Sequence, residues 1–120
     1  MSIDISTRMI GRVRVIAVAG RVDHLSAADF ESGLAPLIDD YGGGPGQTPA
    51  IVFDLGAMSY ISSAGLRVLW AAAKRARERE GKMAVAALTA LVAEVFTVTR
   101  FDIYFGRFDT VDAAVAAMAV

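Results

Sequence analysis

Two adjacent serines, Ser62 and Ser63, are the residues of this 120-residue sequence with the clearest chemical potential. They precede an apolar-periodic segment and therefore stand at a strand-to-helix junction. A serine there typically caps the helix, accepting a hydrogen bond from an early amide, here that of Ala64 or Gly65. The same place suits phosphorylation, because the unpaired amides and the helix dipole stabilise an anion, and Arg67 follows one turn after Ser63. The two interpretations are compatible.

Hydrolytic chemistry is poorly supported by the other polar residues. Ser63, His24 and Asp23 can be drawn as nucleophile, base and orienting acid, but Asp23 and His24 are adjacent, which hinders that orientation. A nucleophile elbow requires Gly-x-Ser-x-Gly, whereas residues 61–65 read Ile-Ser-Ser-Ala-Gly. Asp54 ends an apolar segment without a cluster of partner acids that would bind magnesium. We therefore expect no enzyme and no catalytic residue.

Composition narrows the remaining classes of protein. There is no cysteine and a single histidine, which excludes disulfide frameworks and thiolate zinc sites, so neither a metal nor a cofactor is expected. Twelve basic and thirteen acidic residues give a net charge of -1, which argues against direct nucleic-acid binding and against a basic membrane-binding patch. The longest apolar run, Met83–Ala93, is broken only by Thr89 and is shorter than the roughly 18 residues of a membrane span. With no signal-peptide pattern at the N-terminus, a soluble cytoplasmic protein is expected.

The apolar residues recur in some segments with the period of a strand and in others with that of a helix, which predicts alternating strands and helices. The chain length predicts a single domain spanning residues 1–120. Strands are expected at Ile3–Met9, Val13–Ala19, Ala50–Phe53, Lys82–Ala87 and Ile103–Phe108. Helices are expected after Ser26, from Ser63 to about Glu80, over Ala90–Thr99, and after Asp109 or Thr110. The predicted order is ββαβαβαβα, an N-terminal hairpin followed by mostly parallel strands with right-handed crossovers. Because two of the strands are apolar on both faces, helices should cover both sides of the sheet.

Local signals refine the first third of the chain. Ser26 is expected to cap the first helix, with Leu25 and Phe30 at the two positions of a hydrophobic staple. Gly20 is expected to end the second strand, and Pro36 to kink or break the first helix. The glycine-rich stretch 42–49 lacks the Gly-Lys-Ser/Thr of a phosphate-binding loop and is interpreted as a plain surface connection.

Several segments together resemble the STAS domain family. Gly20–Ala28 resembles the family's Gly-Glu-Leu-Asp segment and the capped helix after it, with Arg21 in place of the Glu. Asp54–Leu69 resembles its signature, in which a strand-ending Asp-Leu leads to an aromatic residue, an apolar residue, Asp/Ser-Ser-x-Gly-Leu and a helix. Val95–Phe96, Phe101–Phe105 and Asp109–Ala114 look like the last helix-strand-helix, so the resemblance covers essentially the whole chain. It implies a STAS-like α/β fold with a mixed sheet and about four helices.

A free-standing domain of this size is similar to bacterial anti-sigma factor antagonists, which regulate transcription. The resemblance implies binding to a serine-kinase anti-sigma factor, release when Ser63 is phosphorylated, and resetting by a phosphoserine phosphatase. Ser62, which stands where many members have Asp, is the second possible acceptor. The residues implied to bind the partner are Asp23, His24, Ser26, Ser62, Ala64, Gly65 and Arg67.

The expected assembly is a monomer or weak dimer that neither enters a membrane nor contacts nucleic acid directly. One alternative is an adaptor in a lipid-transport or stressosome-like complex, using the same face without phosphorylation. A small hydrolase is the other, and it has the least support.

Overall fold

The computed structural model describes residues 3–39, 50–101 and 105–118. The secondary structure of these residues, in chain order, is β1 (Asp4–Ile10), β2 (Val13–Val22), α1 (Ala27–Asp39), β3 (Ala50–Asp54), β4 (Met58–Ile61), α2 (Ser63–Glu78), β5 (Lys82–Ala86), α3 (Ala90–Val98), β6 (Gly106–Phe108) and α4 (Val111–Met118). The expected α/β fold with a mixed sheet and four helices is confirmed. The predicted glycine-rich connection at 42–49 and part of the predicted last strand lie outside the described residues.

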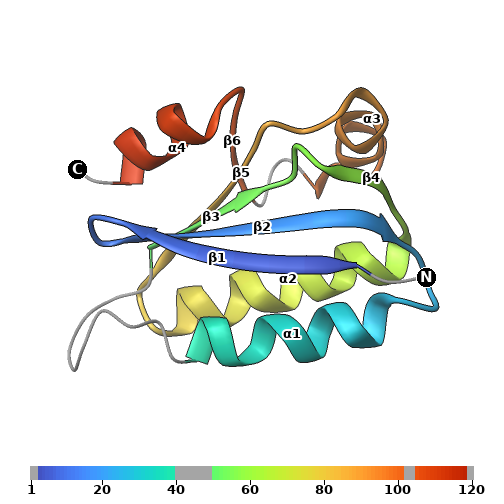
Figure 1. The fold of residues 1–120 in the computed structure, drawn as a ribbon, viewed down its shortest axis with the longest axis horizontal. Coiled ribbons are helices and arrows are strands. Elements are labelled where there is room, and N and C mark those ends of the chain that lie inside the picture. Colours follow the sequence, from blue (N-terminus) through green and yellow to red (C-terminus); the bar gives the residue numbers. More distant parts are fainter. Residues whose placement is uncertain (1–2, 40–49, 102–104, 119–120) are drawn as a thin grey trace.

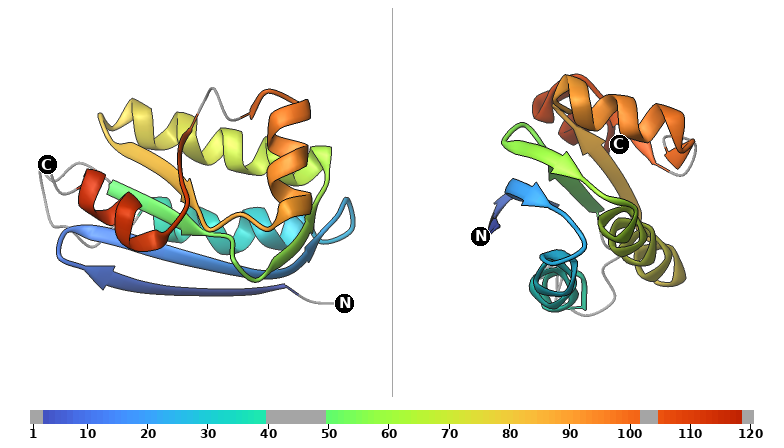
Figure 2. Two further views of the ribbon diagram at one scale, coloured as in Figure 1. Left: turned by 90° about the horizontal axis from the view of Figure 1, so that it is seen from above. Right: turned by 90° about the vertical axis from the view of Figure 1, so that its right-hand side faces the viewer.

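One mixed sheet organises the molecule. Its strand order is β1-β2-β3-β5-β6, with β4 pairing separately with β2. The hairpin β1–β2 is antiparallel, and all the other pairs are parallel. Helices α1 and α2 lie side by side on one face, while α3 and α4 lie on the other (Figures 1 and 2). Sequential strands joined through helices are therefore parallel, as predicted from the alternating pattern.

The prediction missed one strand and ended another too early. Residues 58–61, interpreted as part of a link, form the strand β4. Gly20 does not end β2: it has φ +104°, and the pairing register shifts between Gly20 and Arg21. This bulge turns the end of β2 away from β3 and onto β4. The observed order is therefore ββαββαβαβα.

Tertiary packing also overrides two predictions about α1. A kink or a break was expected at Pro36. The helix does not break there, because Phe30, Leu34 and Ile38 anchor its inner face with at most 2% of each side chain exposed. The predicted staple is wrong, since Leu25 is 79% exposed while Phe30 is fully buried. The start of α1 is therefore fixed by other contacts.

Two apolar cores fill the space between the sheet and the helices. The larger core lies mainly under α1 and α2, with Phe30, Phe53 and Leu69 among its fully buried members. The smaller core lies under α4 and consists of Val13, Val15, Val52, Ala86 and Ala114. Both faces of β2 and β3 are thus covered, as their apolar sequences predicted. No helix among the described residues is long and apolar enough to cross a membrane.

Candidate functional site

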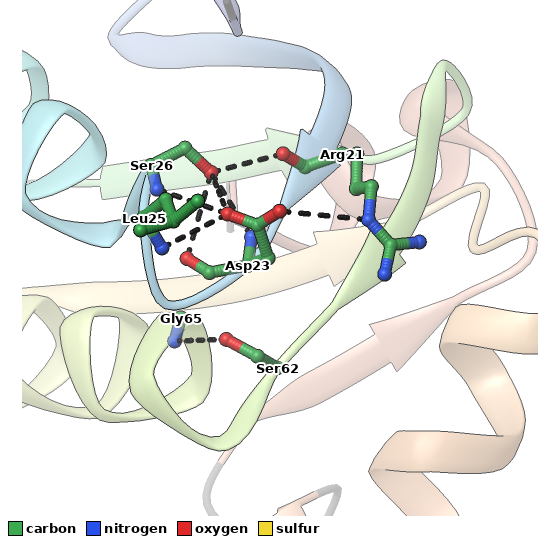
Figure 3. A network of polar contacts seen from close by, with 6 residues as sticks. All are labelled: Arg21, Asp23, Leu25, Ser26, Ser62 and Gly65. Carbon is green, nitrogen blue, oxygen red and sulfur yellow. Dashed lines mark hydrogen bonds and ion pairs between the residues drawn. The ribbon is translucent and has the colours of Figure 1, made fainter. Parts of the chain in front are cut away.

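Ser62 is the N-cap of α2. Its backbone is extended, with φ −91° and ψ 173°, and its Oγ accepts a hydrogen bond from the Gly65 amide at 3.2 Å (Figure 3). Its own amide donates to the Val22 carbonyl at 2.8 Å, which ties the helix start to the end of β2. The predicted capping role of this serine pair is confirmed and belongs to Ser62.

Ser63 is the first residue of α2 and is exposed to solvent. Within the described part of the chain its hydroxyl makes no hydrogen bond, whereas the Ser62 hydroxyl is partly buried and used by the cap. The two serines therefore differ in accessibility although they are adjacent in sequence. Ser63 presents a free hydroxyl at the positive end of the helix dipole, where an added phosphate is stabilised.

Close packing holds this junction in place. A Cβ atom at Gly65 would lie 2.7 Å from Val22 Cγ1 and 2.8 Å from Ile61 Cγ1, so the helix start touches the ends of β2 and β4. Gly65, which was expected on the partner-binding surface, is buried beneath it. The glycine acts instead by allowing the close approach that positions Ser63.

A second polar network precedes α1, beside the same junction. The Asp23 Oδ1 atom accepts hydrogen bonds from the amides of Leu25 and Ser26, each at 3.0 Å, and lies 3.2 Å from the Ser26 Oγ (Figure 3). The Ser26 hydroxyl accepts from the Asp23 amide at 3.0 Å and lies 3.0 Å from the Arg21 carbonyl. Ser26 is only 6% exposed, so its side chain lies beneath the surface on which it was expected, and partner binding at this position stays a prediction. Asp23, rather than the Ser26 side chain, caps the turn that leads into α1.

The same contacts lower the pKa of the Asp23 carboxyl group below its ordinary value of 3.8. The hydrogen bond from the Ser26 amide contributes most, with further contributions from the Leu25 amide, the Ser26 hydroxyl and the Arg21 charge, while desolvation opposes the change. The ionised carboxylate is therefore a structural part of the turn.

This lowered pKa predicts a loss of stability in acid. The unfolded chain takes up a proton at Asp23 near pH 3.8, whereas the folded chain holds the carboxylate ionised to lower pH. The stabilisation is thus fully present above pH 3.8 and disappears as the pH falls through the lowered pKa. Asp23→Asn should be less stable than the natural chain at neutral pH, and the difference should shrink on acidification, as followed by urea unfolding between about pH 6 and about pH 2.5. The exposed Asp109→Asn provides a matched control, and a pH-independent difference for Asp23→Asn would contradict the prediction.

Arg21 and Tyr60 form a contact that sequence reasoning missed. The Arg21 Cζ atom lies 4.3 Å from the centroid of the Tyr60 ring, and its Nε lies 3.5 Å from Asp23 Oδ2. The two residues face each other because Arg21 pairs with Tyr60 across β2 and β4. Because β4 was not predicted, no signal in the sequence indicated this contact.

The structure does not build a catalytic or metal site from these residues. His24 is exposed, and within the described residues it shares no hydrogen bond with Asp23, whose carboxylate binds backbone amides instead. Among the described residues no three His, Asp or Glu side chains are grouped so as to hold a metal ion. The arrangement is suited to presenting a hydroxyl group and a surface.

Comparison with known families agrees with this arrangement. The model of the STAS domain family matches residues 4–114. The chain belongs to the STAS domain family. BtrV of Bordetella bronchiseptica, named as a candidate anti-sigma factor antagonist, is 35% identical to this STAS chain over 103 residues, which are 86% of this chain and 84% of BtrV.

Two solved structures share the fold of this STAS domain. An anti-sigma factor antagonist from Mycobacterium paratuberculosis is 26% identical, with a TM-score of 0.85 over 99% of this chain and 96% of that chain. The phosphorylated form of the Bacillus cell fate determinant SpoIIAA is 16% identical, with a TM-score of 0.67 over 95% and 98% of the two chains.

The predicted partner-binding residues of the STAS domain divide into two groups. His24 and Arg67 are exposed, and Asp23, Ser62 and Ala64 are partly exposed. Ser26 and Gly65 are buried and support the surface from below. Because the Ser62 amide is bound to the Val22 carbonyl, both groups lie at one end of the sheet, where β2 and β4 end.

Proposed function

We propose that this STAS domain is an anti-sigma factor antagonist that acts as a switch without catalysing a reaction. It binds an anti-sigma factor with serine kinase activity while Ser63 is unmodified, and it releases that kinase once Ser63 is phosphorylated. A phosphoserine phosphatase restores the binding form, and the sigma factor freed in each cycle changes transcription. The observation behind this proposal is the exposed hydroxyl of Ser63 at the start of α2, which makes no hydrogen bond to any residue that the structure describes.

The class of function is supported by the relatives. BtrV, 35% identical over 103 residues, and the Mycobacterium paratuberculosis protein are both named as anti-sigma factor antagonists. The phosphorylated SpoIIAA structure indicates that this fold accommodates a phosphate. These relatives also favour a protein partner over a small-molecule substrate.

The local chemistry supports Ser63 as the acceptor. A kinase must reach the hydroxyl oxygen, and Ser63 is exposed whereas the Ser62 hydroxyl is held by the Gly65 amide. A phosphate on Ser63 gains from the helix dipole, and the exposed Arg67 follows one turn later. Phosphorylation of Ser62 would instead replace the N-cap hydrogen bond of α2.

The surface around Ser63 is suited to a protein partner. Leu25, 79% exposed, adds an apolar side chain to this surface, together with the exposed His24 and Arg67. In the proposed complex this leucine provides an apolar contact within a surface that is otherwise polar. We therefore place the kinase across the starts of α1 and α2.

Mapping the phosphorylated residue tests this proposal. The protein is incubated with ATP and each purified anti-sigma factor kinase of its source organism, and the product is analysed by mass spectrometry. We expect phosphate on Ser63, none in Ser63→Ala, and continued phosphorylation of Ser62→Ala, which should lose only about 1 kcal/mol of stability with its cap. Phosphate on Ser62 alone would refute the assignment of the acceptor. Phosphate on neither serine would favour an adaptor that uses this surface without modification.

A further inference from the structure

The guanidinium group of Arg21 is fixed on two sides and open on the third. It stacks on the Tyr60 ring at 4.3 Å, and its Nε lies 3.5 Å from Asp23 Oδ2. Within the described residues its two terminal nitrogens have no hydrogen-bond partner, and Figure 3 shows them pointing away from the network. The side chain is 53% exposed. These nitrogens are parallel donors, already oriented, at an accessible surface.

The neighbouring acid does not offer its charge to a partner in the same way. One oxygen of Asp23 accepts hydrogen bonds from the Leu25 and Ser26 amides, and the other faces the Arg21 Nε. The Asp23 carboxylate therefore faces groups of its own chain, whereas the Arg21 guanidinium faces solvent. A docking protein meets a cation at this point, although the whole chain has a net charge of -1.

Arg21 lies next to the proposed switch. It precedes Val22, whose carbonyl accepts the hydrogen bond from the Ser62 amide at 2.8 Å, and Tyr60 precedes Ser62 by two residues. We expect a protein docked over Ser63 to reach the Arg21 guanidinium as well, since both residues lie at the end of the sheet where β2 and β4 end. Figure 3 shows the exposed Leu25 in the turn before α1, on the other side of Asp23 from the Arg21 guanidinium.

We propose that Arg21 binds a carboxylate side chain of the partner kinase and thereby contributes to the choice of that partner, an inference that rests on the function proposed above. A planar guanidinium with two free parallel N–H groups matches the two oxygens of an Asp or Glu side chain. Tyr60 and Asp23 hold the plane in place before docking, so little side-chain freedom is lost when the ion pair forms. The expected contact on the kinase is an acidic residue next to an apolar one, which faces Leu25.

Affinity measurements on charge variants test this contact. Against the kinase that binds the natural chain, Arg21→Gln should weaken binding by about tenfold and Arg21→Glu by about 100-fold, since the second change adds repulsion. Arg8→Glu makes the same change of charge at an exposed position on β1 and should leave the affinity unchanged. Arg8 pairs with Val15, which lies about 20 Å from Arg21 along β2. Replacing the matching acid of the kinase by arginine should restore the binding of Arg21→Glu.

Further variants separate recognition from stability. Tyr60→Phe keeps the aromatic ring and should bind like the natural chain, whereas Tyr60→Ala should weaken binding several-fold. Arg21→Gln should also reduce the dependence of the affinity on salt concentration, which a purely structural role would not change. Melting temperatures of the Arg21 variants should stay close to that of the natural chain, because exposed ion pairs contribute little to stability.

The possible outcomes distinguish this inference from the proposed function. If no anti-sigma factor kinase binds the natural chain, the proposed function fails and this inference fails with it. If a kinase binds and Arg21→Glu binds equally well, only the inference about Arg21 is overturned. It is also overturned if Arg21→Gln leaves the unphosphorylated complex intact but lowers the melting temperature of the Ser63-phosphorylated protein, because Arg21 would then bind the phosphate within its own chain.

Discussion

Replacing Ser63 by aspartate is expected to weaken the complex with the anti-sigma factor kinase by at least about 100-fold. On the free domain the added charge is tolerated, because the dipole of α2 stabilises an anion at its N-terminus by roughly 0.3–1 kcal/mol. At a docked interface the same charge loses its water, and a charge without a full partner costs several kcal/mol. A cost of about 3–4 kcal/mol corresponds to a loss of 100-fold or more, at about 1.4 kcal/mol for each factor of ten. Phosphoserine, with about −1.5 to −2 charges at pH 7, should have a larger effect.

Titration calorimetry together with thermal melting measures both parts of this prediction. Ser63→Asp should lose binding with little change in melting temperature, and Ser63→Ala should bind like the natural chain while resisting phosphorylation. Ser6→Asp makes the same substitution at an exposed position on β1, away from the junction, and should leave binding intact. Natural affinity in Ser63→Asp would exclude a charge-operated switch at this residue. Equal losses in Ser6→Asp and Ser63→Asp would mean that net charge, and not the position of the charge, controls binding.

The start of α2 was predictable because its signals are local. An apolar helical period after two serines identifies a capped helix start, and the structure adds which serine caps and which is exposed. That division follows from Gly65, whose approach to Val22 and Ile61 fixes the direction in which the helix leaves the sheet. Two adjacent serines look equivalent in a sequence, so only packing distinguishes them.

The surroundings of the junction were harder to predict because they depend on contacts between distant segments. Strand β4 has four residues, and its partner lies beyond a bulge at Gly20, so neither length nor alternation reveals the pairing that brings Arg21 onto Tyr60. Ser26 was expected to cap α1, and the family resemblance placed it on the partner-binding surface. Asp23, three residues earlier, takes the capping hydrogen bonds, and Ser26 becomes a buried link within the turn.

Helix α1 illustrates the same competition between local and tertiary effects. Pro36 removes one backbone hydrogen bond from the helix interior, which by itself favours a break. Buried residues on either side of it, Leu34 and Ile38, stabilise the helical geometry through the core under α1. Helix propensity predicts the free-energy cost of Pro36 in the helix interior. Only the packing of α1 shows that burial of its apolar side chains offsets this cost.

A buried charge under α4 is expected to have the largest effect on stability. Ala114 is fully buried in the smaller core, against Val13, Val15, Val52 and Ala86. A carboxylate at this position would lie among apolar side chains without a partner, and an uncompensated buried charge typically costs about 3–5 kcal/mol. Ala114→Asp should therefore remove at least about 3 kcal/mol from the free energy of unfolding, a large part of the 5–15 kcal/mol typical of a domain.

Urea unfolding of Ala114→Asp and Ala113→Asp makes the comparison at adjacent positions of one helix. Ala113 is exposed and lies in the first turn of α4, where its amide donates a hydrogen bond to the Thr110 hydroxyl at 3.1 Å. An aspartate there therefore meets water and the positive end of the dipole. The free energy of unfolding of Ala113→Asp should differ from that of the natural chain by no more than about 0.5 kcal/mol. Equal stability of the two variants would show that α4 does not hold Ala114 against the sheet in solution. Helix α4 packs on β3, β5 and β6, away from the starts of α1 and α2. Ala114→Asp should therefore weaken partner binding only by reducing the fraction of the protein that is folded.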